Sequence, residues 1–381
     1  MGEFLREFIN VFGKSPLVAI RRLPKALSVL RAALKATSVA SPKFPIRLQL
    51  EVTNRCNYRC IMCDRENWVA IGKKLDDVMD FDTFKKLTDE IAPMYMTLNG
   101  WGEPLMNRDM PKIIEWCHNR QITSAMPTNL GFINDELFEK LILHLPTILT
   151  ISMHGATKET YEAITKTKTY DRFLHYFEKL LSRTGKDRLR ILCALQAKNL
   201  GEFEAFYQFL KKWGMLEKFN LICVFDFRTP APEEQRVIPT QEEKARTLKA
   251  LESAIADSDT EEKKRFLQTW RERLLEIESF EAVHEDGPCF IPWISTFILA
   301  NGDVLPCCYL TGGIHKMGNI HERSFTEIWN SELYRTFRSR ISNDRANLEG
   351  CKNCPRNDSR RLRRYSLLIG GLRRSGWKKG S

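Results

Sequence analysis

The feature that most constrains the fold is an alternation of short apolar or β-branched runs with amphipathic segments, repeated about six times from Ile46 onward. The intervening segments carry apolar residues at helical spacing, as at Phe81, Phe84, Leu87 and Ile91. The runs span residues 46–53, 94–100, 123–129, 147–154, 190–196 and 220–227. This alternation predicts an α/β fold with a parallel sheet and right-handed crossovers, either an open doubly wound sheet or a (β/α) barrel. Because eight units close a complete barrel, six units favour a partial one.

The rest of the chain divides into segments that differ in charge and in cysteine content. A charged helical linker is expected at 236–283, followed by a compact cysteine-containing module at 284–358. In that module an Asn301-Gly302 turn predicts a β-hairpin, and Ser324 with Glu327 forms a capping box that opens a helix running to about Ile341. The expected units are 1–43 (basic amphipathic helices), 44–235 (barrel), 236–283 (linker), 284–358 (cysteine module) and 359–381 (basic tail).

Charge is concentrated at the two ends. The net charge is +11, of which residues 1–43 carry +6 and residues 356–381 carry +8, leaving −3 for the body. A uniformly basic nucleic-acid-binding domain is therefore disfavoured, and the amphipathic cationic ends favour contact with a membrane surface. Packing of the ends on the barrel, or plain solvation, is the alternative. With neither a membrane-spanning stretch nor a secretory signal, we expect a cytoplasmic protein, peripheral at the inner face of the membrane.

Three of the eleven cysteines follow the first predicted strand, as Cys56, Cys60 and Cys63. Three thiolates within eight residues can hold three corners of an iron–sulfur cube, which leaves one iron open for a substrate or cofactor. A zinc knuckle is the alternative, but zinc needs a fourth Cys or His, and none occurs in the next fifty residues. Cys117, Cys193 and Cys223 have no motif partners and are expected to be buried packing residues.

The CxxxCxxC pattern after the first strand resembles the radical S-adenosylmethionine (SAM) enzymes, whose core is a partial (β/α)6 barrel. The resemblance implies a [4Fe–4S] cluster whose open iron binds SAM, and cleavage of SAM to a 5′-deoxyadenosyl radical. Gly100-Trp101-Gly102-Glu103 is similar to the family's GGE motif, with Trp101 in place of a glycine, and Met62 occupies the position that packs on adenine.

Further strand ends match the family. Asn129 ends the third strand, and Ser152 is similar to the serine that meets the cofactor, with His154 where the family has aspartate. The cofactor-binding residues implied by the resemblance are Met62, Gly100, Gly102, Glu103, Asn129, Ser152 and Gln196. His154 and Arg228 are the candidate catalytic residues at the mouth of the barrel, and structural or solvated roles are the alternatives for both.

Four cysteines of the second module, Cys289, Cys307, Cys351 and Cys354, can close a metal site completely. Structural zinc is the alternative, although zinc more often pairs two CxxC knuckles, and only one is present here. The surrounding residues resemble the SPASM/twitch auxiliary-cluster domain of the same superfamily. The resemblance selects Cys307 over Cys308 and implies one fully ligated auxiliary [4Fe–4S] cluster, of the shorter twitch type.

The sequence thus predicts hydrogen abstraction from an unactivated C–H bond, followed by oxidation or by C–C or C–S bond formation. The basic ends favour a lipid or lipid-linked substrate, with another small molecule as the broader class. Similar domains act on peptides and amino sugars, but a peptide modifier is expected to carry a recognition domain, and none is evident before residue 44. A flavodoxin or ferredoxin is the expected one-electron donor. A non-catalytic Fe–S or zinc scaffold is the alternative of another class.

Overall fold

One mixed sheet organises the molecule. The computed structural model describes residues 44–45, 47–65, 69, 74–224, 236–279, 289, 291–308, 310 and 314–351. In this part of the chain nine strands form one sheet in the order β6-β5-β4-β3-β2-β1-β7-β8-β9. The strands are β1 (Arg47–Leu50), β2 (Tyr95–Leu98), β3 (Thr123–Thr128), β4 (Ile148–Ser152), β5 (Leu189–Leu195), β6 (Phe219–Cys223), β7 (Ser295–Ile298), β8 (Asp303–Leu305) and β9 (Gly318–Asn319).

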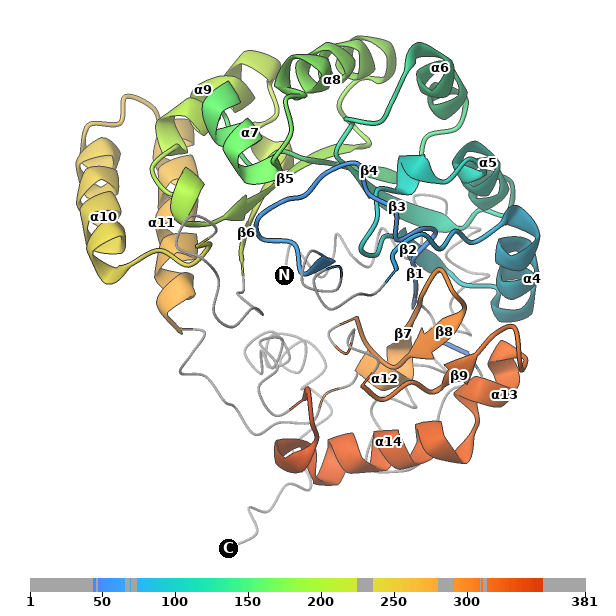
Figure 1. The fold of residues 1–381 in the computed structure, drawn as a ribbon. Coiled ribbons are helices and arrows are strands. Elements are labelled where there is room, and N and C mark those ends of the chain that lie inside the picture. The colour runs from blue at the N-terminus through green and yellow to red at the C-terminus, as the bar shows by residue number, and fades with distance from the viewer. Residues whose placement is uncertain are drawn as a thin grey trace, which may run out of the picture.

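The first six strands are parallel and adjacent in chain order, and each overlaps one of the six predicted runs. Figure 1 shows the curved sheet inside an outer ring of helices. The fold is therefore an α/β partial barrel, as predicted, with the carboxyl ends of its strands along one rim. The helices are α4 (Phe81–Ile91), α5 (Met110–Asn119), α6 (Asp135–Leu143), α7 (Lys158–Thr165), α8 (Tyr170–Thr184), α9 (Phe203–Trp213), α10 (Gln241–Ala256), α11 (Glu261–Ser279), α12 (Ile291–Ile294), α13 (Phe325–Trp329) and α14 (Glu332–Asn343).

Alternation along the strands produces the two faces of the sheet. Leu48 and Leu50 of β1 are fully buried, whereas Gln49 between them is half-buried. Met96 and Leu98 of β2 repeat the pattern. Each fully buried aliphatic side chain contributes roughly 1.5–3 kcal/mol, so the helix-covered face supplies most of the driving force. The other face is left for polar side chains.

Helix boundaries follow local capping chemistry. The Asp80 side chain accepts a hydrogen bond from the Thr83 N–H at the start of α4. Thr240 and Glu243 form a capping box at the start of α10. Such caps satisfy N–H groups that have no partner inside the helix, each worth roughly 0.5–2 kcal/mol.

The cysteine module extends the barrel sheet. β7 pairs in parallel with β1, and β8 and β9 then add antiparallel strands. The predicted hairpin is confirmed, with Gly302 in the turn at φ +87°, a conformation that favours glycine. Consequently the strands of the barrel and those of the cysteine module form one continuous sheet, joined where β1 pairs with β7.

The predicted single helix from Ser324 to Ile341 is two helices, α13 and α14 (Figure 1). The Ser324–Glu327 capping box is present as predicted. The first helix then ends at Asn330, because the Ser331 hydroxyl accepts a hydrogen bond from the Tyr334 N–H and caps the start of a new helix. A serine in an amphipathic run can thus act as a cap rather than continue the helix.

The segment expected as a linker is helical, and its second helix packs on the sheet. Trp270 of α11 is fully buried, and its Nε1–H donates to the Leu200 carbonyl at 3.1 Å. The Cys223 thiol of β6 donates to the Arg273 carbonyl of α11 at 3.2 Å. Cys117, Cys193 and Cys223 are all buried, as predicted. Among the described residues, no helix is both long and apolar enough to cross a membrane.

Candidate functional site

A loop after β1 carries the first three cysteines. Cys56, Cys60 and Cys63 are half-buried, and the Cys63 N–H donates to the Cys60 carbonyl at 2.9 Å, which closes a turn between them. Burial raises the pKa of the Cys56 thiol to about 12. The Cys56 thiol therefore stays neutral at pH 7 unless a cation such as iron offsets the buried charge.

Backbone hydrogen bonds hold this loop on the C-terminal end of α7. The Arg59 N–H donates to the Thr165 carbonyl at 3.2 Å, and the Ile61 N–H donates to the Ile164 carbonyl at 2.9 Å. These carbonyls end a helix and have no partner inside it. The cysteine loop thus satisfies the helix end and takes its shape from it.

Tyr58, between the first two cysteines, anchors the loop from beneath. Its hydroxyl lies 2.6 Å from Thr169 Oγ1 and 3.1 Å from the Tyr161 hydroxyl, and the ring is buried. A Cβ at Gly131 would lie 2.1 Å from the same hydroxyl. Gly131 therefore provides the space in which Tyr58 fits.

The turn after β2 packs directly on the cysteine loop. The Glu103 N–H donates to the Arg55 carbonyl at 2.8 Å. A Cβ at Gly102 would lie 2.2 Å from the Thr53 oxygen and 2.5 Å from the Arg55 oxygen. Two backbones meet here without room for a side chain, which explains the glycine independently of any cofactor.

The Glu103 carboxylate is buried at the junction of β2 and β3. It accepts hydrogen bonds from Thr128 Oγ1 at 2.7 Å, the Asn129 N–H at 2.7 Å and the Leu105 N–H at 3.2 Å. No lysine or arginine pairs with it in the described part of the chain, and burial raises its pKa to about 7. A ligand with an ammonium group would supply the missing positive charge.

Asn129 links this carboxylate to the cysteine loop. Its Nδ2 donates to Asn57 Oδ1 at 3.0 Å, while its own N–H is held by Glu103. The structure therefore brings the predicted residues Gly102, Glu103 and Asn129 together with the three-cysteine loop. Thr128 and Asn57 complete the network and were not predicted as site residues.

Glu51 is a second buried carboxylate that the sequence reasoning missed. Its Oε1 accepts from the Trp101 N–H at 2.7 Å, and its Oε2 accepts from the Ala300 N–H at 3.1 Å. Burial raises its pKa to about 7. A Cβ at Gly100 would lie 2.4 Å from Glu51. The only sequence signal was an acid directly after an apolar strand.

His154 and Gln196 lie at the ends of β4 and β5. His154 Nδ1 accepts from the Ala194 N–H at 3.2 Å, and burial lowers its pKa to about 4, which keeps the ring neutral. As placed, this ring joins two strand ends, and its catalytic role stays a prediction. Ser152 is half-buried, and Gln196 is fully buried.

At the ends of β2 and β5, three buried side-chain oxygens have no hydrogen-bond partner in the described part of the chain: Thr97 Oγ1, Asn99 Oδ1 and Gln196 Oε1. Buried polar atoms are normally satisfied, so such atoms indicate a place where a polar ligand binds. Together with the unpaired charge of Glu103, they fit SAM, which has an ammonium group and several hydroxyl and amine donors.

Met62 is half-buried and packs on a small apolar cluster, separate from the main core, that includes Ile61 and Val224. Two predicted site residues, Arg228 and Cys354, lie outside the described residues, as do the basic ends 1–43 and 359–381. The predictions made for them therefore remain predictions.

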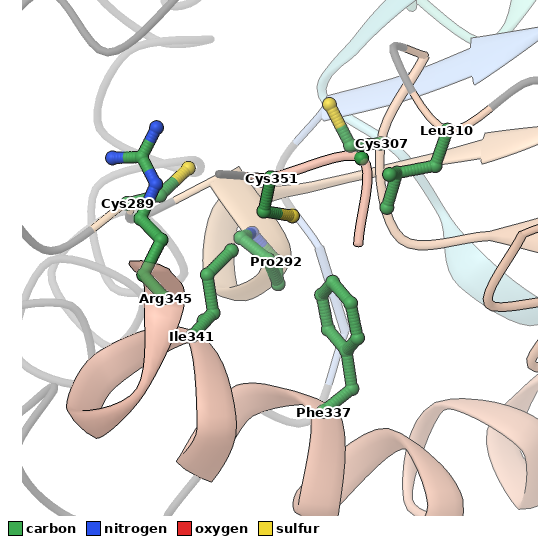
Figure 2. Close-up of a pocket in the computed structure, with 9 residues that line it drawn as sticks. Cys289, Pro292, Cys307, Leu310, Phe337, Ile341, Arg345 and Cys351 are labelled. Atoms are coloured by element: carbon green, nitrogen blue, oxygen red, sulfur yellow. The ribbon is translucent and has the colours of Figure 1, made fainter. Parts of the chain in front are cut away.

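A cavity, called the auxiliary cavity below, lies in the cysteine module (Figure 2). Cys289, Cys307 and Cys351 line it, and Cys308 does not. The remaining lining residues are Pro292, Leu310, Phe337, Ile341, Arg345 and Gly350. Three thiols in one mainly apolar pocket fit an iron–sulfur cluster, and Cys354, three residues after Cys351, would provide the fourth.

Among the described residues, no three His, Cys, Asp or Glu side chains converge as ligands of one metal ion. An iron–sulfur cube does not need such convergence, because each thiolate binds a different iron. The residue types of both groups thus fit a cluster, with three cysteines of each group in the described part of the chain; the fourth predicted ligand of the second group, Cys354, stays a prediction.

Two family models match the chain. Residues 50–210 match the radical SAM superfamily, and residues 289–355 match SPASM, described as an iron–sulfur cluster-binding domain. The matched ranges contain both cysteine groups described above.

Individual relatives agree with these matches. The chain is 22% identical over 318 residues to the tungsten-containing aldehyde ferredoxin oxidoreductase cofactor-modifying protein of Pyrococcus furiosus. The match covers 76% of this chain and 82% of that protein. It resembles the structure of Streptococcus suis SuiB bound to precursor peptide SuiA, with 15% identity, a TM-score of 0.56 and coverage of 84% and 72%. It also resembles native anSMEcpe with bound AdoMet and Cp18Cys peptide, with 17% identity, a TM-score of 0.55 and coverage of 81% and 86%.

The fold, the open three-cysteine loop, the buried carboxylate beside it and the two matched models lead to one assignment. This chain is a radical SAM enzyme with a C-terminal SPASM iron–sulfur domain.

Proposed function

We propose that this enzyme carries out a SAM-dependent oxidation of a peptide substrate. The observation that carries the oxidative part is the pairing of β1 with β7, which places the cysteine loop and the auxiliary cavity on one sheet. When bound, the first cluster supplies the electron that cleaves SAM to a 5′-deoxyadenosyl radical, and the auxiliary cluster supplies an acceptor for a second electron from the substrate.

The residues of the chain have distinct tasks in this proposal. Cys56, Cys60 and Cys63 hold the first cluster, and Glu103 pairs with the SAM ammonium group. Glu103 is already oriented by Thr128 and Asn129, so it needs no rearrangement to bind a cation. Cys289, Cys307, Cys351 and Cys354 hold the auxiliary [4Fe–4S] cluster.

A peptide substrate is supported by likeness rather than by a contact in the chain. SuiB is described with its precursor peptide and anSMEcpe with a Cp18Cys peptide, and both share this fold. The lipid hypothesis depends on the basic ends, which lie outside the described residues. It is therefore the second arm of the test below.

The test begins with anaerobic reconstitution of the full chain. We expect about eight irons per chain, and 5′-deoxyadenosine formation that requires reductant, with flavodoxin or ferredoxin as the proposed donor. The double variant Cys351→Ala, Cys354→Ala should lose about four irons and keep part of the SAM cleavage. Zinc in place of those irons would refute the auxiliary cluster.

The substrate class is then tested by adding peptide pools or vesicles of anionic lipid to the loaded enzyme. We expect a peptide fraction to raise 5′-deoxyadenosine formation and to lose the mass of two hydrogens. Stimulation by the lipid vesicles alone, with a product in the lipid fraction, would overturn the peptide proposal and support the lipid hypothesis.

A further inference from the structure

The cysteine module contains a fully buried arginine. Arg338 of α14 has no exposed surface, and its guanidinium lies between two aromatic rings. The guanidinium carbon is 4.1 Å from the centre of the Trp329 ring and 4.0 Å from that of Tyr334. Cation–π contacts of this kind stabilise a cation partly, but they do not neutralise it.

The charge of Arg338 has no acidic partner in the described part of the chain. Its Nε donates to the Pro292 carbonyl at 3.0 Å, and its Nη1 donates to the Trp329 carbonyl at 2.9 Å. Nη2 is buried and makes no hydrogen bond to any described residue. A buried cation without an anion is costly, so its retention calls for an anion that the side chains do not provide.

The auxiliary cavity lies directly beside this arginine. Pro292, whose carbonyl binds Arg338, lines the cavity, as do Phe337 and Ile341 of the same helix. Figure 2 shows these three residues around Cys351. Tyr334, on which Arg338 stacks, is fully buried on the same helix, and its hydroxyl donates to Thr296 Oγ1 at 3.3 Å. Arg338 thus does not line the cavity itself but binds Pro292, which does.

A cube held by four thiolates carries a net negative charge, which becomes more negative by one unit on reduction. A fixed cation in a low-dielectric surrounding stabilises the reduced form more than the oxidised form. A buried cation acts more strongly than an exposed one, because solvent does not screen it.

We propose that Arg338 is the buried counter-cation of the auxiliary cluster and raises its reduction potential. This inference rests on the proposed loading of that cavity with a [4Fe–4S] cluster. A higher potential makes the cluster a better acceptor of an electron from the substrate, so Arg338 is a positioning residue for charge and does not touch the substrate.

The alternative is that Arg338 only ties α14 to the Pro292 and Trp329 carbonyls. The two roles separate in a matched series of full-length variants: Arg338→Gln, Arg338→Lys, and Arg335→Gln as the control. Arg335 lies on the same helix but is exposed, so its removal changes the net charge equally without changing the buried charge. The series is made with Cys56, Cys60 and Cys63 all replaced by Ala, so that only the auxiliary cluster remains.

The measurement is a redox titration followed by EPR, with iron and sulfide counted on each sample. We expect Arg338→Gln to shift the equilibrium toward the oxidised cluster at least tenfold at a fixed potential, which is about 59 mV for one electron. Arg335→Gln should shift it less than twofold, and Arg338→Lys should stay closer to the parent than Arg338→Gln. A fully loaded Arg338→Gln protein that titrates at the parent potential would overturn the proposal.

Loss of loading in Arg338→Gln is also informative. If Arg338→Lys then loads and titrates near the parent, the charge is what the site needs, as proposed. If Arg338→Lys loses the auxiliary cluster to the same extent as Arg338→Gln, the hydrogen bonds to the two carbonyls are what the site needs, and the counter-cation role is refuted. Failure of the parent itself to hold an auxiliary cluster would instead refute the proposed function.

Discussion

The N–H of Trp101 donates a 2.7 Å hydrogen bond to Oε1 of Glu51, which joins the turn after β2 to the end of β1. The other oxygen of Glu51 accepts from Ala300 in the β7–β8 hairpin. One carboxylate thus connects β1, the turn after β2 and the β7–β8 hairpin of the SPASM domain. It can do so because it accepts at both oxygens.

This arrangement predicts the effect of Glu51→Gln. A glutamine can accept only through its oxygen, so its NH2 group faces either the Trp101 or the Ala300 N–H, and one hydrogen bond is lost. We expect a loss of roughly 1–3 kcal/mol in stability and weaker SAM binding, measured by thermal unfolding and equilibrium dialysis. Glu90→Gln is a suitable control, since its carboxylate also binds backbone N–H groups but lies at α13. Unchanged SAM affinity in Glu51→Gln would contradict the coupling.

Glu103 predicts how SAM binding depends on pH. Its pKa is raised to about 7, and the cationic ammonium group of SAM binds the ionised carboxylate. SAM affinity of the cluster-loaded enzyme should therefore increase as the pH rises from about 6 to about 8. Glu103→Gln should bind SAM more weakly and should lack this pH dependence. Parallel pH profiles for the two proteins would show that Glu103 does not titrate on binding.

The same two carboxylates predict the stability of the cofactor-free chain. Glu51 and Glu103 have folded pKa values of about 7, raised from 4.5, so the folded chain keeps their protons where the unfolded chain has lost them. The contribution of these two carboxyl groups to the free energy of unfolding should thus be full below about pH 4.5. It should fall as the pH rises to about 7, by up to about 1.4 kcal/mol per group and pH unit. Urea unfolding at several pH values, compared with Glu103→Gln, measures this slope. A rise over that window that both proteins share would contradict it.

Gly102→Ala tests the close contact between the turn and the cysteine loop. The new methyl group would meet the Thr53 and Arg55 backbone oxygens, which cannot move without moving the cysteines. We expect loss of iron from the first cluster and loss of SAM cleavage, with the auxiliary iron retained. Gly201→Ala is the control, because nothing lies within 4 Å of a Cβ there. Full iron content in Gly102→Ala would show that the loop adapts.

Tyr58→Phe removes the hydroxyl that anchors the cysteine loop. Tyr161 loses a buried hydrogen bond and Thr169 a partly buried one, at a total cost of about 1–3 kcal/mol. The first cluster should be released faster on air exposure, monitored by its visible absorbance. Tyr176→Phe is the control, because the Tyr176 hydroxyl makes a long hydrogen bond of 3.4 Å to Asp135, away from the cysteine loop. This variant should behave like the unsubstituted protein. Equal rates of cluster loss in all three proteins would rule out the anchoring role.

Much of the fold could be predicted from the sequence, since the signals for it are local. The six runs, the Asn301-Gly302 turn and the Ser324 cap each depend on a few neighbouring residues. The single helix expected from Ser324 to Ile341 was wrong, because a serine with helical neighbours on both sides gives no local sign that it will cap. Packing of Trp270 under α9 depends on a contact across 70 residues, which spacing does not reveal.

The candidate site divides in the same way. The cysteines and Glu103 lie in short motifs, so their positions in the chain were sufficient to propose them as site residues. Glu51, by contrast, has partners 50 and 249 residues away, and the proposal for Arg338 depends on the absence of an acidic partner among the described residues. Neither an absent partner nor a distant one leaves a pattern in the sequence.

The pairing of β1 with β7 also bears on how the chain folds. About 250 residues separate these neighbours, so the strand that leads into the cysteine loop gains its second neighbour only after most of the chain has been synthesised. Until then β1 presents an open edge, the kind of surface on which other chains aggregate. Such distant pairing also slows folding. We therefore expect a chain truncated before β7 to be insoluble, and iron insertion during synthesis to wait for the complete polypeptide.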